Sequence, residues 1–203
     1  VIDASGCEAS VTIDITQPQE LNVELVAIIE GGGNIIRLGD TTELQALVSL
    51  PPDSLDNITW FPPQLVSCDT CLNTFVAPTS QTTFTITVES NGCVDSDDLT
   101  LFVKKERPVY VPNAFSPNED GINDVFMIFA GKEVARIKSF LIFDRWGETV
   151  YQYYLFPPND PEFSWDGRHR GERLNAAVFT WYAEIEFVDG EVVLYEGDVT
   201  LMR

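Results

Sequence analysis

The chain has 203 residues, with 32 acidic and 12 basic side chains, one histidine and a net charge of −20. Such a charge repels phosphate backbones and anionic lipid, which argues against binding to nucleic acid or to a membrane surface. A single histidine excludes catalytic mechanisms and metal sites that need two imidazoles. Because 44% of the residues are hydrophobic, the chain can form a core. No stretch approaches about 20 apolar residues, so we expect no direct membrane insertion. Composition favours a soluble, extracellular, non-catalytic protein.

Apolar and polar residues alternate in segments spread along the whole chain. This period of two, rich in β-branched and aromatic residues, predicts strands at residues 10–16, 21–25, 83–88, 99–103, 137–143, 179–187 and 192–195. Turn signals at residues 31–34, 91–92 and 189–190 separate them. No run has a convincing helical period. The sequence predicts an all-β fold of two tandem Ig-like β-sandwich domains, preceded by the last strand of a further repeat.

A charged, proline-ended stretch at residues 104–108 separates two strand-rich halves. Residues 1–107 carry 16 acidic and 4 basic side chains, and residues 108–203 carry 16 and 8, so the net charges are −12 and −8. Each half has the size of one Ig-like sandwich, about 100 residues. We therefore predict one domain over residues 17–107 and a second over residues 108–203.

The N-terminal segment is similar to a later part of the chain. Residues 6–15 align with residues 92–101 at an offset of 86 residues, with Gly, Cys and Ser matching and two apolar positions in phase. An offset of about one sandwich indicates that residues 1–16 are the last strand of a preceding repeat in a longer array. The alternative is a coincidence between two Gly-Cys turns.

The four cysteines are Cys7, Cys68, Cys71 and Cys93. Cys68 and Cys71 have C-x-x-C spacing, but zinc needs a second such pair or histidines. A redox role needs a following helix, whereas residues 72–76 predict a strand. A structural disulfide in an oxidising exterior is the better interpretation. Chain entropy gives roughly 2 kcal/mol for Cys68–Cys71 and roughly 3–3.5 kcal/mol for the alternative Cys71–Cys93. Both stay open, and we prefer the first because adjacent cysteines meet whatever the strand order.

One short loop gathers oxygen-bearing side chains around Gly121, which permits a sharp turn. These side chains are Asn118, Asp120, Asn123 and Asp124. Calcium prefers six to eight hard oxygens, so the loop is a candidate calcium site, although no EF-hand glutamate follows. The alternative is a turn in which Asn and Asp bond their own backbone.

Two sequence features are candidates for contact with a partner. Asp144-Arg145-Trp146-Gly147 predicts a hairpin turn in which Arg145 stacks on Trp146 or pairs with Asp144 or Asp166. This turn serves domain stability or direct partner contact.

The second feature is a basic cluster in an acidic chain, Arg168, Arg170 and Arg173 around His169. It forms a solvated loop that balances local charge or docks to an acidic receptor loop. We predict that His169 lies on the surface, and that Trp165 is packed with its indole N–H on a carbonyl.

Glu184 and Glu186 share a strand face, roughly 6–7 Å apart, as paired carboxylates of glycosidases can. We predict instead that both acids are solvated, because they alternate with apolar residues. No nucleophile elbow, P-loop or dinucleotide motif occurs. The sequence therefore favours a protein that is not an enzyme.

The second half carries an ordered set of motifs. These are residues 111–126 (Val-Pro-Asn-Ala-Phe-Ser-Pro-Asn-Glu-Asp-Gly-Ile-Asn-Asp-Val-Phe), residues 142–151 (Ile-Phe-Asp-Arg-Trp-Gly-Glu-Thr-Val-Tyr), Trp165-Asp166-Gly167 and the closing residues 197–203. The set resembles the gliding-motility-associated C-terminal domain, the type B sorting domain of the type IX secretion system. Glu119 departs from it, since the family usually has Gly there. Residues 17–107 resemble the Ig-like or PKD-like modules that precede such domains, without the Trp-Asp-Phe-Gly-Asp-Gly mark of a true PKD domain.

The resemblance implies a secreted protein attached to the cell surface at the outer membrane. It implies recognition by the outer-membrane translocon and by a PorP/SprF-like partner, with further Ig-like repeats upstream and an adhesin as the working part. Alternatives are the tail of a secreted hydrolase or a subunit of a surface filament. The candidate partner contacts are Arg145, Trp146, Arg168, Arg170, Arg173 and Arg203.

Overall fold

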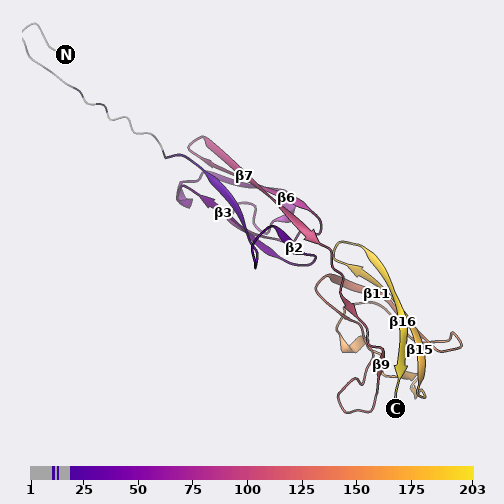
Figure 1. Ribbon diagram of the computed structural model, residues 1–203. Coiled ribbons are helices and arrows are strands. Elements are labelled where there is room, and N and C mark those ends of the chain that lie inside the picture. Colours follow the sequence, from indigo (N-terminus) through magenta and orange to yellow (C-terminus); the bar gives the residue numbers. More distant parts are fainter. Residues whose placement is uncertain (1–10, 12, 14–18) are drawn as a thin grey trace, which may run out of the picture.

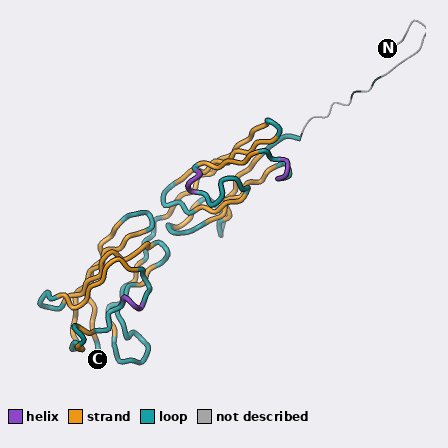
Figure 2. Tube along the Cα trace, turned by 180° about the vertical axis from the view of Figure 1, so that it is seen from behind, coloured by secondary structure: helices purple, strands orange, loops and turns teal. Residues whose placement is uncertain are grey.

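The computed structural model describes residues 11, 13 and 19–203, which form two β-sandwich units placed end to end (Figure 1). Figure 2 shows strands and loops throughout, with only short helical turns. These turns are the 3-10 helices η1 (Pro52–Ser54), η2 (Pro63–Leu65) and η3 (Pro161–Phe163). Within the described residues, no helix has the length and apolar character of a membrane span. The predicted all-β sandwich fold is confirmed.

The first unit consists of two facing sheets. A three-stranded sheet has the order β1 (Val23–Ile28), β3 (Thr42–Val48), β5 (Asn73–Val76). A four-stranded sheet has the order β2 (Ile35–Arg37), β7 (Cys93–Lys104), β6 (Thr82–Ser90), β4 (Asn57–Phe61). All pairs are antiparallel except β2 with β7.

Alternation along the strands builds the core of the first unit. In β6, Phe84, Ile86 and Val88 are fully buried, because every second side chain faces the opposite sheet. Trp60 of β4 is also buried, and its indole N–H donates to the Cys71 carbonyl at 2.7 Å. A buried tryptophan at this place between the sheets is typical of Ig-like sandwiches.

Two carboxylates connect the two sheets of the first unit. Asp95 and Asp97 of β7 accept hydrogen bonds from the backbone amides of Val23 and Leu25 at 2.7 and 2.8 Å. These bonds satisfy amides of β1, an edge strand of the other sheet. The polar side chains in this part of β7 therefore belong to a strand. The predicted strand 99–103 is only the end of β7, which begins at Cys93.

A disulfide joins Cys68 and Cys71, with 5.6 Å between their Cα atoms. Cys93 is exposed and bonds to no described cysteine, so the alternative pairing Cys71–Cys93 is not formed. The bridge lies in the loop before β5, next to the carbonyl that accepts the Trp60 N–H. It therefore fixes a loop that the core tryptophan depends on.

The second unit is built on one five-stranded sheet. Its order is β12 (Thr149–Phe156), β11 (Val134–Phe143), β15 (Ala177–Phe187), β16 (Val192–Leu201), β9 (Ala114–Phe115). Two small ribbons complete the unit, β8 (Val109–Tyr110) with β10 (Phe129–Ala130) and β13 (Arg168–His169) with β14 (Glu172–Arg173). Only β9 pairs in parallel, with the end of β16.

One face of this sheet is covered by aromatic side chains from the connecting segments. Phe126 and Trp165 exchange two backbone hydrogen bonds of 2.9 Å and are both buried. Trp165 also lies against Phe115 of β9 and Phe179 of β15, with ring centroids 5.3 and 4.9 Å apart. The second layer of the sandwich is therefore mostly loop, held down by aromatic contacts.

The predicted strands correspond to β1, β6, β7, β11, β15 and β16, with shifted ends. Residues 21–25 predict a strand that instead runs from Val23 to Ile28, and residues 192–195 predict one that continues to Leu201. β16 extends this far because it stays paired with β15 beyond Gly197. The strand predicted for residues 1–16 lies outside the described residues, except for Val11 and Ile13, which are exposed.

Removal of the disulfide tests its role in the first unit. Replacing both Cys68 and Cys71 with Ser should lower the free energy of unfolding by about 2 kcal/mol, because the reduced unfolded chain regains loop entropy. Urea unfolding followed by circular dichroism measures this change. Cys93→Ser is the control and should leave the stability unchanged. If the unmodified protein, the double variant and Cys93→Ser unfold at the same urea midpoint, the disulfide does not contribute to stability.

Candidate functional site

Three of the predicted partner arginines gather at the end of the second unit that lies away from the first. Arg168, Arg173 and Arg203 line one open pocket of about 360 Å³. Its other lining residues are Pro117, Glu119, Asp124, Val125 and Asp166. Figure 1 shows the C-terminal end of β16 at this end of the molecule, beside β9. We call this site the arginine pocket.

Trp165 positions the arginine hairpin. Its indole N–H donates to the Arg168 carbonyl at 2.9 Å, as predicted for a packed tryptophan. Between them, Gly167 has a φ of +74°, and an added Cβ would lie 3.0 Å from Leu201 Cδ1. Only glycine fits this conformation and this space without strain. The chain therefore turns at Gly167 and runs out as the β13–β14 ribbon.

The pocket arginines are paired but retain free donors. Arg173 Nη2 lies 2.8 Å from Glu119 Oε1, and Arg168 Nε lies 3.3 Å from Asp166 Oδ2. All four side chains are more than two-fifths exposed, so these pairs add little stability. Each guanidinium has five N–H donors in a planar fork, more than one carboxylate occupies. The site can therefore accept a further carboxylate.

Arg203 fixes the floor of the pocket in a different way. Its guanidinium donates to the Leu174 carbonyl at 2.8 Å and to the Gly167 carbonyl at 3.5 Å. These contacts tie the last residue of the chain to both ends of the arginine ribbon. Arg203 therefore positions the ribbon while its charge stays at the pocket.

The acidic loop beside the pocket is held by its own hydrogen bonds. Asp124 accepts from the amides of Glu119 and Gly121, each at 2.7 Å. Asp120 accepts from the Asn118 side-chain amide and from the Ile122 amide, each at 2.8 Å. These contacts match the interpretation of the loop as a turn that bonds its own backbone. Asn123 adds a positive φ of 53°, and its carbonyl accepts the amide of Ser116.

Calcium binding by this loop stays a prediction. Among the described residues, no three His, Cys, Asp or Glu side chains are grouped so that they could hold a metal ion. Asp120 and Asp124 are the two carboxylates of the predicted calcium ligand set, and both already accept backbone amides.

Glu119 was not among the predicted site residues, yet it belongs to the pocket. Its φ is +68°, a left-handed conformation that glycine adopts most easily. The expected family glycine at this position was the signal that could have identified the turn. The side chain that replaces it here places a carboxylate on Arg173.

Arg170 and the turn at residues 144–147 lie outside the lining of the arginine pocket. Arg170 pairs with Glu148 at 3.4 Å. Arg145 stacks on Trp146, with 5.9 Å from its guanidinium carbon to the ring centroid. Trp146 is 83% exposed, so it does not serve as a core residue.

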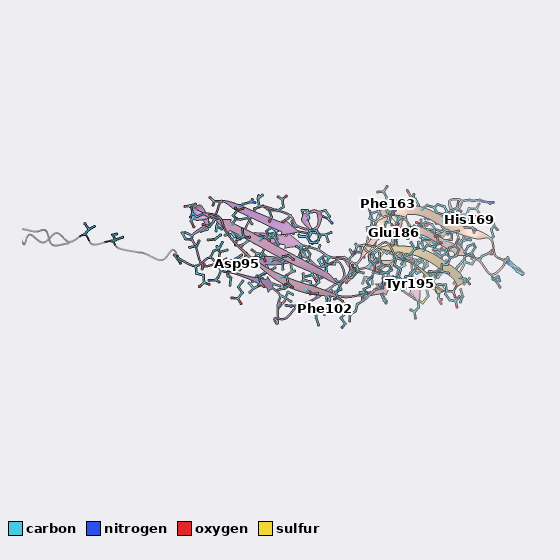
Figure 3. All side chains as sticks on the ribbon, turned by 90° about the horizontal axis from the view of Figure 1, so that it is seen from above. Asp95, Phe102, Phe163, His169, Glu186 and Tyr195 are labelled. Carbon is cyan, nitrogen blue, oxygen red and sulfur yellow. A yellow bond between two sulfur atoms is a disulfide. The ribbon has the colours of Figure 1, made fainter. Side chains whose placement is uncertain are left out.

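The prediction that His169 lies on the surface is wrong. Its side chain is 22% exposed, and Nδ1 lies 3.0 Å from the Val150 carbonyl. Figure 3 shows His169 near the end of the molecule away from the first unit. The ring is covered because the β13–β14 ribbon folds back on β12.

Glu184 and Glu186 have separate structural partners. Glu184 accepts from the Ser139 hydroxyl at 3.0 Å, and Glu186 pairs with Arg136 at 2.7 Å. The hydrogen bond from Arg136 lowers the pKa of Glu186, and the hydrogen bond to Glu186 raises the pKa of Arg136. Each of the two carboxylates is thus held by a structural partner of its own.

The second unit is thus a β-sandwich. The charged side chains of its loops lie together at the end that points away from the first unit. Residues 109–200 match the family model described as the CHU_C Type IX secretion signal domain. The predicted resemblance is confirmed for this part of the chain, which is a type IX secretion signal domain. The chain therefore carries the secretion signal of a secreted protein.

Solved structures resemble the chain at low identity. A Bacteroides ovatus SGBP-B structure in complex with a mixed-linkage heptasaccharide is 14% identical with a TM-score of 0.32, covering 84% of this chain and 42% of that one. Fibronectin(III)-like modules of Clostridium thermocellum CbhA are 12% identical with a TM-score of 0.30, covering 89% and 93%. Dimeric latent PorU from Porphyromonas gingivalis is 10% identical with a TM-score of 0.32, covering 84% and 19%. This chain thus spans less than half of the Bacteroides ovatus and PorU chains. No curated protein matches the chain.

Acid titration tests the hydrogen bonds of the acidic loop. Two hydrogen bonds lower the pKa of Asp120. The larger effect comes from the side-chain amide of Asn118 and the smaller from the backbone amide of Ile122. Because the folded-state pKa is lowered, the stabilising effect is present above the unfolded-state pKa and is lost as pH falls through the folded-state pKa. Asn118→Ala should raise the pKa of Asp120 towards its usual value, as measured by carboxyl ¹³C NMR. Asn123→Gly, at a position where glycine accepts the positive φ, is the control. An unchanged Asp120 pKa in the Asn118 variant would show that its amide does not hold the loop.

Proposed function

We propose that the arginine pocket is the surface by which the type IX machinery recognises this signal domain. The observation that supports the proposal is the meeting of Arg168, Arg173 and Arg203 in one pocket on the domain that matches the secretion signal. The pocket lies at the end away from the preceding unit, where a receptor approaches without contacting that unit. Its partner is an acidic loop of the outer-membrane translocon, since guanidinium forks bind carboxylates in two-point contacts.

The charge of the chain supports this assignment. A net charge of −20 repels an acidic partner at most of the surface. The three guanidinium groups of the pocket balance Glu119, Asp124 and Asp166, so this part of the surface is locally neutral and repels an acidic partner less than the surrounding surface does. It therefore favours one docking orientation, which is the usual effect of charge complementarity on association.

In this proposal, residues 108–203 are the sorting domain and residues 17–107 are an Ig-like spacer. The chain is the C-terminal part of a secreted, non-catalytic cell-surface protein, an adhesin with further Ig-like repeats upstream. A PorP/SprF-like outer-membrane protein holds the sorting domain at the surface after export, in the context of gliding motility and adhesion. The alternatives are the tail of a secreted hydrolase and a subunit of a surface filament.

The exposed Trp146 supports a second contact, used for attachment. A large indole that is 83% exposed and lies under Arg145 has the properties of an interface anchor. Pro108, Val109, Tyr110 and Phe129 line a separate apolar hollow on the same unit. We assign attachment to the Trp146 turn because it alone combines exposure with a paired arginine.

An export assay tests the recognition proposal. The whole chain is fused behind a general export signal and a fluorescent reporter in a bacterium with a type IX system. We expect surface fluorescence that disappears when the translocon is deleted. Replacing both Arg168 and Arg173 with Glu should lower surface fluorescence about tenfold or more, because the pocket changes from locally neutral to strongly negative.

Arg136→Glu is the matched control, since Arg136 is an exposed, paired arginine of the same unit outside the pocket. It should leave export unchanged. Equal export of the double variant and the control would exclude the pocket as the recognition surface. Surface fluorescence that persists without the translocon would exclude the secretion role itself.

A second experiment separates attachment from folding at the Trp146 turn. Trp146→Ala should change the free energy of unfolding by less than about 0.5 kcal/mol, because an exposed side chain loses few contacts. It should, however, move the reporter from the cell surface into the medium. Thermal unfolding and cell fractionation measure the two effects. A destabilised protein with normal attachment would instead assign Trp146 a structural role.

A further inference from the structure

A residue of the first unit completes the core of the second. Leu38 follows β2, and its amide donates to the Lys104 carbonyl at 3.0 Å. Its side chain is fully buried, but within the hydrophobic cluster of the second unit. That cluster also contains Phe187 and Ile185 of β15. Leu38 therefore belongs to the first unit by its position in the sequence, but its side chain packs into the core of the second unit.

The next two residues also contact the second unit. Gly39 has a φ of +81°, and an added Cβ would lie 2.8 Å from the Lys132 carbonyl oxygen and 3.1 Å from the Glu133 amide nitrogen. Asp40 pairs with Lys132. Residues 38–40 thus make an apolar, a close backbone and an ionic contact in succession. An accidental touch between two independent modules would not be expected to combine all three.

A second set of contacts holds the linker. Arg107 pairs with Asp189 at 2.7 Å and with Glu191, and its guanidinium carbon lies 5.0 Å from the Phe187 ring centroid. Lys105 pairs with the same Asp189 at 2.9 Å. Asp189 has 4% and Arg107 18% of its side chain exposed, so this pair is largely shielded from water, whereas Lys105 and Glu191 stay about half exposed. Figure 3 shows the strands of the two units meeting at this junction.

The placement of basic residues in the first half agrees with these contacts. Residues 1–107 have only four basic side chains, Arg37, Lys104, Lys105 and Arg107. All four lie at the end of β2, at the end of β7 or in the linker. Lys105 and Arg107 pair directly with the second unit. The cations of an otherwise acidic module are thus concentrated where it meets the signal domain.

We propose that the folded secretion signal extends into the preceding module, with residues 38–40 as part of the signal domain. The two units then form one rigid body, and the partner of this junction surface is the neighbouring module of the same chain. The importance for export rests on the proposed function, whereas the structural claim does not. A chain cut at residue 108 would lack Leu38 and both basic residues that hold the linker.

Hydrogen exchange on the purified whole chain tests the proposal. Leu38→Ala should speed exchange of the β11 and β15 amides about thirtyfold or more, because it opens a cavity in the second core. Leu44→Ala is the matched control, a fully buried leucine in the core of the first unit. It should speed exchange mainly in β1, β3 and β6. Mass spectrometry of peptides assigns each change to its strand.

A glycine pair keeps the test independent of cavity formation. Gly39→Ala should separate the units and speed exchange at residues 131–134 and in the β15–β16 turn. Gly33→Ala has a similar φ of +86° but nothing within 4 Å of the added Cβ, so it isolates backbone strain from contact. It should leave the second unit unchanged.

The outcomes separate the two proposals. Faster exchange confined to the first unit in the Leu38 variant, or equal effects of Gly39→Ala and Gly33→Ala on the second unit, would overturn the shared fold. Neither measurement uses the secretion system, so a failed export assay leaves this inference standing. If the exchange results for the Leu38 and Gly39 variants are as expected but the Arg168 and Arg173 double variant is exported normally, only the recognition proposal is overturned.

Discussion

The position of Trp165 determines most of the functional end of the molecule. Its backbone pairs with Phe126, its ring packs between Phe115 and Phe179, and its indole N–H holds the Arg168 carbonyl. One side chain therefore connects the sheet, the segment that leads from the acidic loop and the arginine ribbon. A buried indole N–H without an acceptor costs free energy, and for Trp165 that acceptor lies in the ribbon. The arginine pocket is thus a consequence of how the core is closed.

Charge is distributed along the chain according to the task of each part. The first half concentrates its basic residues at the junction, and in the second half Arg168, Arg173 and Arg203 meet in the arginine pocket. Away from the junction, the charged residues of the first half are all acidic. Acidic surfaces on neighbouring copies repel each other, which keeps such modules separate in solution. Lysine and arginine occur at the junction, at the arginine pocket and its neighbouring turn, and on β11, where Arg136 pairs with Glu186.

Local alternation explains why the long strands could be predicted, because β6 and β15 bury every second side chain by themselves. The same rule missed the start of β7, where Asp95 and Asp97 look like loop residues but bond the amides of β1. Leu38 could not be assigned, since it is buried in a cluster whose other buried members are residues 115–201 of the second unit. Arg168, Arg170 and Arg173 were visible as a cluster in sequence, but Arg203 joins the pocket through its hydrogen bonds to the Leu174 and Gly167 carbonyls. The alternation of apolar and polar residues shows which side chains of one strand face the core. It does not show which loops lie together in the folded chain.

The two ends of the signal domain have complementary physical roles. At the junction, buried contacts and shielded ion pairs remove the rotational freedom that a charged linker would otherwise have. At the other end, exposed arginines stay solvated and retain free donors. Binding then loses less orientational entropy, because the pocket is already held in a fixed direction relative to the preceding module. If the arginine pocket is the recognition surface as proposed, a freely swinging domain would lose that entropy on each encounter, and the rigid junction and the exposed pocket would strengthen the same interaction from opposite ends.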